Sequence, residues 1–501
     1  MKNDYDDIEI LNINRKRRIP SDETELLDPV VVKKTINKEV LKQESSDYAK
    51  KVETPTRSSI REESEKKTTK KSKKTKEKKP AKLWEKVFWG VSLAFILGCC
   101  IFYGQRLIHY YKIYNPTDPS GNRVQLIADE ITGKSEYVYE GSGLYSNETG
   151  YVYKGEVENN YLKYNNMLWR ILKINTDGTI VIVLEDSMTQ LPWNNKSTNY
   201  KDSDIHKYLN NDFLNQLDKS YLVKYSFCED SVESLANISC EKKNSDSYVS
   251  LLDISSFLNS IVDKKTYLVD GWDTIFWLNN YSNDKVWHTN EVNVSQSDAN
   301  NFYQVRPVVK LKSTIAYVSG DGTKENPYLT TKEDSLSIGS KVKLGDDTWV
   351  VYDTNNGTRL MLDKVLNKTY RYDLDKLTYE TDSKSSLAEY LNTEYLDSLS
   401  YKDLLEEVEW VDGGYSTSLD DIKKNKNKAK VGVPSLLDYQ FDSSVTGYFT
   451  TTSQEEYILV YDNPLHASKV TISRSIRPCI SLKEDAVSKL KLVDGVYTMG
   501  D

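Results

Sequence analysis

The sequence predicts an α+β protein in which two tandem homologous domains follow a disordered tail and one transmembrane helix. Three observations lead to this fold class. The first 82 residues are rich in lysine and poor in aromatic residues, an uncharged stretch of nineteen residues comes soon after them, and four blocks in the remainder occur twice in the same order. A chain of 501 residues is too long for one compact core, so we expect several structural units.

The composition excludes several classes of protein. Hydrophobic residues make up 38% of the chain and the mean hydropathy is −0.61, which is too polar for a multi-span membrane protein. Residues 113–501 carry 41 basic and 58 acidic side chains, and this acidic bulk argues against nucleic acid as the main partner. Because the chain has only four histidines and five cysteines, we expect no metal site and no cofactor.

Residues 1–82 have the composition of a disordered, basic cytoplasmic tail, since Lys, Glu, Ser and Thr dominate. Residues 83–112 are predicted to form a transmembrane signal-anchor helix. Within them, Val87–Gln105 carries no charge and would span roughly 28 Å as a helix, close to the hydrocarbon thickness of about 30 Å. The positive-inside rule then leaves Lys66–Lys82 in the cytoplasm, against anionic lipid headgroups, and residues 113–501 outside. We therefore expect a single-pass, type II protein of the cell membrane.

The part of the chain after the anchor contains two copies of one domain. The segment around Trp169 and the segment around Trp349 both read as a strand, a polar turn, a strand that begins near Trp, an Asn/Asp-Gly turn and a third strand. Three more blocks repeat in the same order: 203–217 with 385–399 and 249–257 with 431–439, each at an offset of 182, and 305–312 with 476–483. Such an ordered set of matches indicates an internal duplication.

Each copy has hairpin strands first, a short helix in the middle and a strand at the end. This order favours an α+β arrangement, with helices packed on an antiparallel sheet. We expect residues 113–160 to form a stalk or an N-terminal elaboration, residues 161–331 to form repeat 1, and residues 332–501 to form repeat 2.

Four residues recur at equivalent positions and are expected to be structural. Trp169 and Trp349 are each flanked by alternating apolar residues, which is typical of core positions. Arg306 and Arg477 each precede a proline and an apolar strand. Contact with an anionic ligand is one reading of these arginines, but their recurrence in both copies favours pairing with a carboxylate or with backbone carbonyls.

The repeated blocks resemble a family of uncharacterised envelope-anchored proteins of Gram-positive bacteria, whose domains combine an LWR hairpin, an S-x-L-x-x-Y-L-N helix and a terminal RPV-x-L-K strand. The resemblance covers most of residues 137–499, twice. The closing pattern is also distantly similar to C-type-lectin-like and formylglycine-generating-enzyme-like domains, which implies a fold of that kind. The calcium and sugar motifs of classical C-type lectins are missing, as is the cysteine pair of copper-dependent formylglycine-generating enzymes.

The sequence contains no recognisable catalytic arrangement. G-x-S-x-G does not occur, and His206, His288 and His466 fall at non-equivalent positions of the two copies, so we expect the protein not to be an enzyme. Cys228 and Cys240 lie in one loop of copy one with eleven residues between them. Outside the membrane a disulfide between them is predicted, and two metal ligands are the alternative.

The candidate ligand site lies in the loop region Tyr267–Tyr303, where copy one is rich in tryptophan and copy two has none. Such rings offer rigid stacking faces for sugar rings or peptide side chains, although two of the tryptophans could instead fill the core. The candidate ligand-binding residues are Trp272, Trp277, Tyr281, Trp287 and His288.

The predicted function is that of a membrane-anchored cell-surface binding protein, which presents tandem extracytoplasmic domains to a glycan, peptide or protein ligand. The alternative is a scaffold of a bacterial cell-envelope assembly, with partners on both sides of the membrane and a cytoplasmic protein bound to the tail. The net charge of −17 on residues 113–501 disfavours adhesion to anionic wall polymers.

Overall fold

The structure is a computed structural model that describes Leu97, Tyr103, Gly104 and residues 124–194, 197–236, 238–269, 274–330, 335–442 and 444–500. The predicted tail, 1–82, lies outside the described residues, as does the predicted anchor, 83–112, apart from the three residues named first. Within the described part of the chain, no helix is both long and apolar enough to cross a membrane. Both repeats belong to one compact unit.

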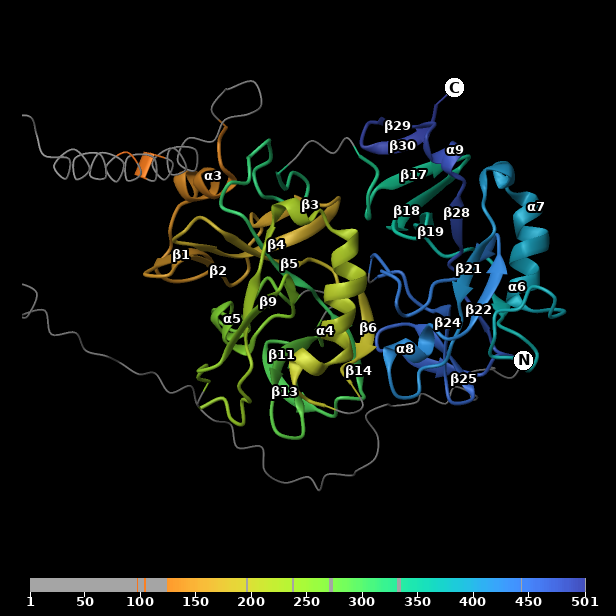
Figure 1. Ribbon diagram of the computed structural model, residues 1–501, viewed down its shortest axis with the longest axis horizontal. Helices are drawn as coiled ribbons and strands as arrows, with labels where there is room; N and C mark the ends of the chain where they lie inside the picture. The colour runs from red at the N-terminus through yellow and green to blue at the C-terminus, as the bar shows by residue number, and fades with distance from the viewer. Residues whose placement is uncertain are drawn as a thin grey trace, which may run out of the picture. The chain divides into compact units, whose positions relative to one another are not determined.

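The described residues form an α+β fold, as predicted, with many short strands and few helices (Figure 1). The first repeat and the segment before it contain α3 Ile127–Lys134, β1 Gly143–Asn147, β2 Gly150–Lys154, β3 Tyr161–Tyr164, β4 Met167–Asn175, β5 Ile180–Leu184, β6 Thr189–Pro192, η2 Tyr200–Asp202, α4 Asp204–Tyr208, η3 Leu209–Phe213, η4 Leu214–Gln216, η5 Lys219–Tyr221, β7 Leu222–Val223, β8 Tyr225–Cys228, β9 Lys243–Ser247, β10 Val249–Ser250, α5 Ile254–Asn259, β11 Trp277–Tyr281, β12 Val286–Asn290, β13 Asn293–Ser297, β14 Phe302–Val305, β15 Val308–Leu311 and β16 Tyr328–Leu329.

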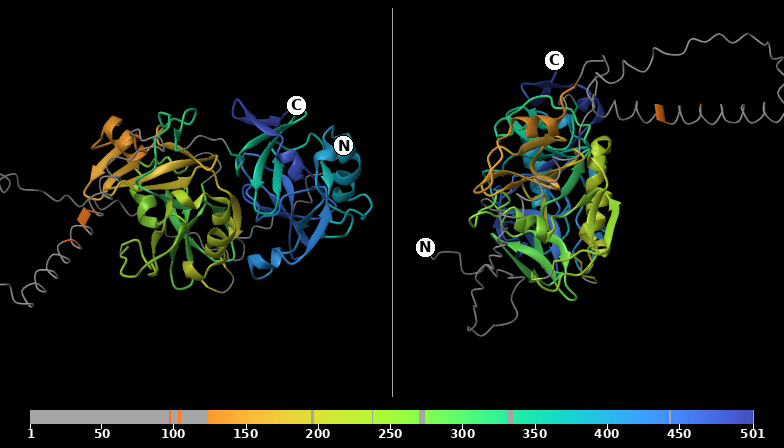
Figure 2. Two further views of the ribbon diagram at one scale, coloured as in Figure 1. Left: turned by 45° about the horizontal axis from the view of Figure 1, so that its top comes forward. Right: turned by 90° about the vertical axis from the view of Figure 1, so that its left-hand side faces the viewer.

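The second repeat follows the same plan and forms its own group of elements (Figure 2, left). It contains β17 Lys341–Leu344, β18 Asp347–Asp353, β19 Thr358–Leu362, β20 Tyr370–Arg371, α6 Leu387–Tyr390, η6 Leu391–Tyr395, α7 Leu396–Ser398, η7 Lys402–Leu404, β21 Val408–Val411, α8 Leu419–Ile422, β22 Lys426–Ala429, β23 Val431–Gly432, β24 Tyr448–Gln454, β25 Tyr457–Tyr461, β26 His466–Ser468, β27 Ser473–Arg474, β28 Cys479–Leu482, α9 Glu484–Val487, β29 Leu490–Val493 and β30 Val496–Met499.

The two repeats share one strand order in their central sheets. Repeat 1 pairs its strands in the order β3-β4-β5-β15-β10, and repeat 2 in the order β17-β18-β19-β28-β23. In both, a late strand returns to pair in parallel with the first one, β16 with β3 and β30 with β17. The register agrees as well, since Trp169 pairs with Leu162 and Leu184, and Trp349 pairs with Val342 and Leu362. The two central sheets therefore share one strand order and one register around the two tryptophans.

Residues before repeat 1 are part of its sheet. Strand β1 pairs with β2, and β2 pairs with β4, while Ile127 and Ile131 of α3 are fully buried in the core. The described residues of 113–160 are therefore an elaboration of repeat 1, and the reading of this segment as a stalk is wrong for them. The side chains of Leu144 and Tyr153 are almost fully buried, whereas a free stalk would expose them to water.

An asparagine fixes the middle helix of each repeat to a short edge strand. Asn210 Oδ1 accepts hydrogen bonds from the backbone N–H groups of Tyr248 and Val249, and its Nδ2 donates to the carbonyl of Val249. Asn392 does the same with Lys430 and Val431. Each asparagine satisfies backbone groups that would otherwise be unpaired, which explains why the L-N pair ends the helical motif in both copies.

Candidate functional site

The two repeats are joined by hydrogen bonds between non-equivalent parts of the copies. Gln216 Nε2, in η4, donates to Asp353 Oδ1 at the end of β18 over 2.7 Å. The Tyr208 hydroxyl, at the end of α4, donates to the Leu437 carbonyl over 2.6 Å. Apolar residues of repeat 2, such as Leu436, also belong to the core that fills repeat 1. The helical segment of one repeat is therefore held against the sheet and loops of the other.

A cleft of about 860 Å³ lies where the repeats meet, and both repeats line it. Its size is in the range of small-molecule and oligomer sites, which are typically about 300–1,000 Å³. Amide side chains are prominent in the lining: Asn211, Asn215 and Gln216 from repeat 1, and Asn355 and Asn356 from repeat 2. Each amide can both donate and accept hydrogen bonds, so the cleft suits a ligand with many hydroxyl or amide groups.

Most of the charge in the cleft is balanced by ion pairs. Asp212 lies 2.9 Å from the Lys423 ammonium, and Glu409 lies 3.3 Å from that of Lys426. Three more charged groups line the cleft and have no ion pair within 4 Å among the described residues: Asp353, Arg359 and Asp438. With four carboxylates and three cations the lining is close to neutral, which favours an uncharged ligand over a polyanion.

Arg359 lies on β19 and is fixed from one side. Its Nη2 donates to the Glu409 carbonyl over 3.0 Å, and its guanidinium carbon lies 5.1 Å from the centre of the Trp410 ring. Stacking on an aromatic ring holds the plane of a guanidinium without using its N–H groups. The arginine therefore keeps donors for a ligand in the cleft.

Asp438 lies in the loop after β23 and is partly buried in the cleft wall. Its Oδ2 accepts the backbone N–H of Ser435 at 2.7 Å. Burial raises the pKa of Asp438 to about 6, although the Ser435 hydrogen bond and the charge of Arg359 act in the opposite direction. Next to these groups, the buried Tyr352 hydroxyl makes no hydrogen bond of ordinary geometry to any described residue.

Repeat 1 forms the same sheet without the arginine and the tyrosine. For Asp438 the two copies exchange positions: Asp253 accepts the Ser256 N–H in repeat 1, and Asp438 accepts the Ser435 N–H in repeat 2. Register and block offset give the equivalent residue at each position. The pairs are Leu172 and Tyr352, Val181 and Arg359, and Ser256 and Asp438. Partly buried charges and buried hydroxyls cost stability, so the packing of the sheet does not account for Arg359 and Tyr352 in repeat 2.

The structure places two of the sequence-predicted ligand residues in the core instead. Trp277 is fully buried, and its ring N–H donates to the Leu191 carbonyl at 2.8 Å. Trp287 is 6% exposed and donates in the same way to the Val232 carbonyl. These two rings offer no stacking face to a ligand, so for Trp277 and Trp287 the structure shows the core-filling alternative that the sequence leaves open. Trp272 lies outside the described residues.

The other two predicted ligand residues are also committed to neighbours. His288 is buried, with its ring nitrogens within hydrogen-bond distance of the Thr289 carbonyl and the Ser297 hydroxyl. Burial lowers the pKa of His288, so the ring is neutral at pH 7. Tyr281 is partly buried, and its hydroxyl donates to the Glu229 carbonyl. Neither residue lines the inter-repeat cleft.

The four residues expected to be structural are buried in equivalent surroundings. Trp169 and Trp349 are fully buried. Arg306 Nε donates to the Leu184 carbonyl over 3.1 Å, and Arg477 Nε donates to the equivalent Leu362 carbonyl over 3.0 Å. Both arginines therefore bind backbone carbonyls, which is the structural reading of the two that the sequence leaves open.

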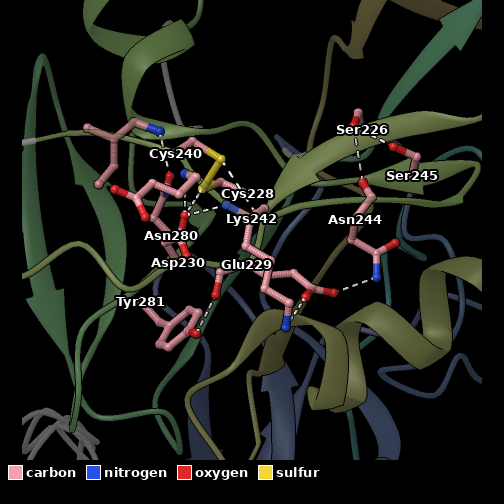
Figure 3. The surroundings of a disulfide bond; sticks show 12 residues. Ser226, Cys228, Glu229, Asp230, Cys240, Lys242, Asn244, Ser245, Asn280 and Tyr281 are labelled. Carbon is pink, nitrogen blue, oxygen red and sulfur yellow. Dashed lines mark hydrogen bonds and ion pairs between the residues drawn. A yellow bond between two sulfur atoms is a disulfide. The ribbon is translucent and has the colours of Figure 1, made fainter.

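Cys228 and Cys240 form a disulfide in the structure, as the sequence predicts (Figure 3). It lies at the end of the β8–β9 hairpin, where Asp230 Oδ2 accepts the backbone N–H groups of Glu241 and Lys242. The neighbouring Glu229 is paired with Lys242, and this hydrogen bond lowers the pKa of Glu229 to about 2. The remaining cysteine of the described part, Cys479, is a buried free thiol.

The sequence reasoning did not identify the cleft residues. The cleft residues could have been found by looking for positions where one copy has a polar residue and the other copy has an apolar one, as with Arg359 and Val181. A contact between residues far apart in the chain is not visible in an alignment of the two copies.

Comparison of this chain with known proteins finds no match among protein-family models, curated proteins or solved structures. The family resemblance inferred from the repeated blocks therefore stays a prediction, and the site is argued from its own residues.

Proposed function

We propose that this chain is a single-pass, membrane-anchored cell-surface protein whose two repeats together bind an extracytoplasmic ligand. The observation that carries the proposal is the cleft of about 860 Å³ lined by both repeats. Its walls are joined by the bond from Gln216 to Asp353, so the site is formed before a ligand arrives. A preformed site loses less conformational entropy on binding.

Two features support the location outside the cytoplasm. The Cys228–Cys240 disulfide is of the kind that persists in oxidising compartments. The uncharged segment Val87–Gln105 directly follows a lysine-rich run, the pattern of a signal-anchor with its N-terminus inside.

Protease added to intact, wall-stripped cells should digest residues 113–501 and leave a lysine-rich fragment of residues 1–86, detected with an antibody to the tail. Lysed cells are the control, because there both parts are accessible. Protection of the large domain in intact cells contradicts the proposed topology.

Asn211→Trp should abolish ligand binding by filling the cleft from the helical side. Asn211 is exposed on η3 and lines the cleft. The matched control is Thr393→Trp, at the equivalent exposed position of η6, which does not line the cleft. Binding of the full-length protein in detergent micelles is measured on an array of neutral glycans, anionic polyol-phosphate polymers and peptides. Absence of saturable binding to every class, or equal binding by both variants, contradicts the proposal.

A further inference from the structure

Repeat 2 contributes a group of side chains to the cleft that repeat 1 lacks: Tyr352, Arg359 and Asp438. We propose that this wall of the cleft binds a neutral oligosaccharide, with Asp438 accepting from sugar hydroxyls and Arg359 donating to a neighbouring sugar oxygen. This inference rests on the binding function proposed above and names the ligand class for the same site.

The duplication provides the first argument, since it separates what the fold needs from what the site needs. Strands β5 and β19 hold the same position in the two sheets, yet β5 has Val181 where β19 has Arg359. Likewise, Leu172 in β4 and Tyr352 in β18 lie at equivalent positions, each where the register of its strand shifts. A strand that folds with valine and leucine does not depend on an arginine and a tyrosine hydroxyl.

Unused hydrogen-bonding capacity is the second argument. Arg359 donates through Nε to Asn356 and through Nη2 to Glu409, and its guanidinium also faces the Tyr352 hydroxyl. These contacts use only part of its five N–H donors. Asp438 accepts from Ser435 through Oδ2, so most of its acceptor capacity remains. The buried Tyr352 hydroxyl lies beside the Arg359 guanidinium and the Cys479 thiol, but neither contact has the geometry of an ordinary hydrogen bond. A sugar presents adjacent donors and acceptors that suit all three groups.

The apolar part of the lining favours a sugar over a peptide. Met188, Phe213 and Ile338 line the cleft, but their side chains are almost completely buried in the core. Val411 and Leu437, which are only partly buried, add some apolar surface, but most of the other lining residues carry amides or charged groups. The near balance of charge in the lining also argues against an anionic polymer.

The variant Asp438→Asn tests the inference with little risk to the fold. Asparagine keeps the oxygen that accepts the Ser435 N–H but loses the negative charge. The pKa of Asp438, about 6, lies above the ordinary value near 4, so the charged form is disfavoured in the folded state. This cost is present above pH 6 and disappears as the pH falls toward 4. The thermal midpoint of Asp438→Asn should therefore exceed that of the parent at pH 7.5, with the difference vanishing near pH 4.

The binding measurement uses the full-length protein in detergent micelles and a panel of neutral oligosaccharides built from hexoses and N-acetylhexosamines. We expect saturable binding that Asp438→Asn and Arg359→Val each weaken by about tenfold or more. Asp412→Asn is the control, because Asp412 is also a buried carboxylate of repeat 2 with a raised pKa but does not line the cleft. Its affinity should equal that of the parent.

The outcomes separate this inference from the proposed function. If a peptide or an anionic polymer binds, and Asn211→Trp blocks it, the cleft is a binding site but the ligand class is wrong. If nothing binds, both proposals fail together. If Asp438→Asn binds the sugar as the parent does, or lowers the thermal midpoint at pH 7.5, then Asp438 is a structural residue and the inference is overturned.

Discussion

Arg306→Ala should lower the free energy of unfolding by about 4 kcal/mol, the largest effect that we expect from a single substitution. Arg306 is 2% exposed, and its guanidinium donates to the carbonyls of Leu184, Glu185 and Leu268. Truncation leaves these three buried acceptors unpaired and creates a cavity, and each unpaired buried group costs about 1–3 kcal/mol.

The measurement is urea unfolding followed by tryptophan fluorescence. Arg306→Lys should recover little of the loss, because one ammonium does not reproduce the planar fork of a guanidinium. Arg371→Ala, at an exposed position of β20, is the control and should change stability by less than about 0.5 kcal/mol. A loss below about 1 kcal/mol for Arg306→Ala contradicts the structural role, and Arg477→Ala should behave like Arg306→Ala in repeat 2.

Loss of the Cys228–Cys240 disulfide should cost about 3 kcal/mol, the second largest effect. The bond closes a loop with a sequence separation of 12 residues, and opening it restores freedom mainly to the unfolded chain. The double variant Cys228→Ala/Cys240→Ala should therefore unfold at lower urea concentration than the parent.

Reduction provides the control for this prediction. Dithiothreitol should lower the stability of the parent to that of the double variant and should leave the double variant unchanged. If the reductant destabilises both proteins equally, the effect does not come from the Cys228–Cys240 bond, because only the parent contains it.

The parts of the fold that depend on local pattern could be predicted from the sequence. Strand periodicity around Trp169 and Trp349, and the Arg-Pro pairs at Arg306 and Arg477, identify equivalent core positions because both copies meet the same packing requirement. The disulfide could be predicted because its two cysteines are close in the chain.

For Trp277 the sequence left two alternatives, a ligand site and a core position, and could not decide between them. Its difference from copy two suggested a ligand site, but a core also tolerates different aromatic residues when its neighbours compensate in volume. Trp277 packs against Trp193 and Tyr303, and none of these contacts is encoded by spacing along the chain.

The cleft could not be predicted either, because it forms where the repeats meet. Gln216 and Asp353 are 137 residues apart, and no periodicity relates them. The same limit applies to β1 and β2, which have no counterpart among the described strands of repeat 2 and therefore do not show in a comparison of the copies.

The bond from Gln216 to Asp353 has a further consequence, which concerns symmetry. The residues equivalent to this pair are Ser398 and Lys173, and no hydrogen bond joins them among the described residues. The two copies therefore meet head to tail, through different faces, and not about a two-fold axis. A two-fold axis between the copies would have repeated each contact, and with it the cleft, at a second, equivalent place. A head-to-tail contact forms the inter-repeat cleft once, so we expect one ligand for each chain.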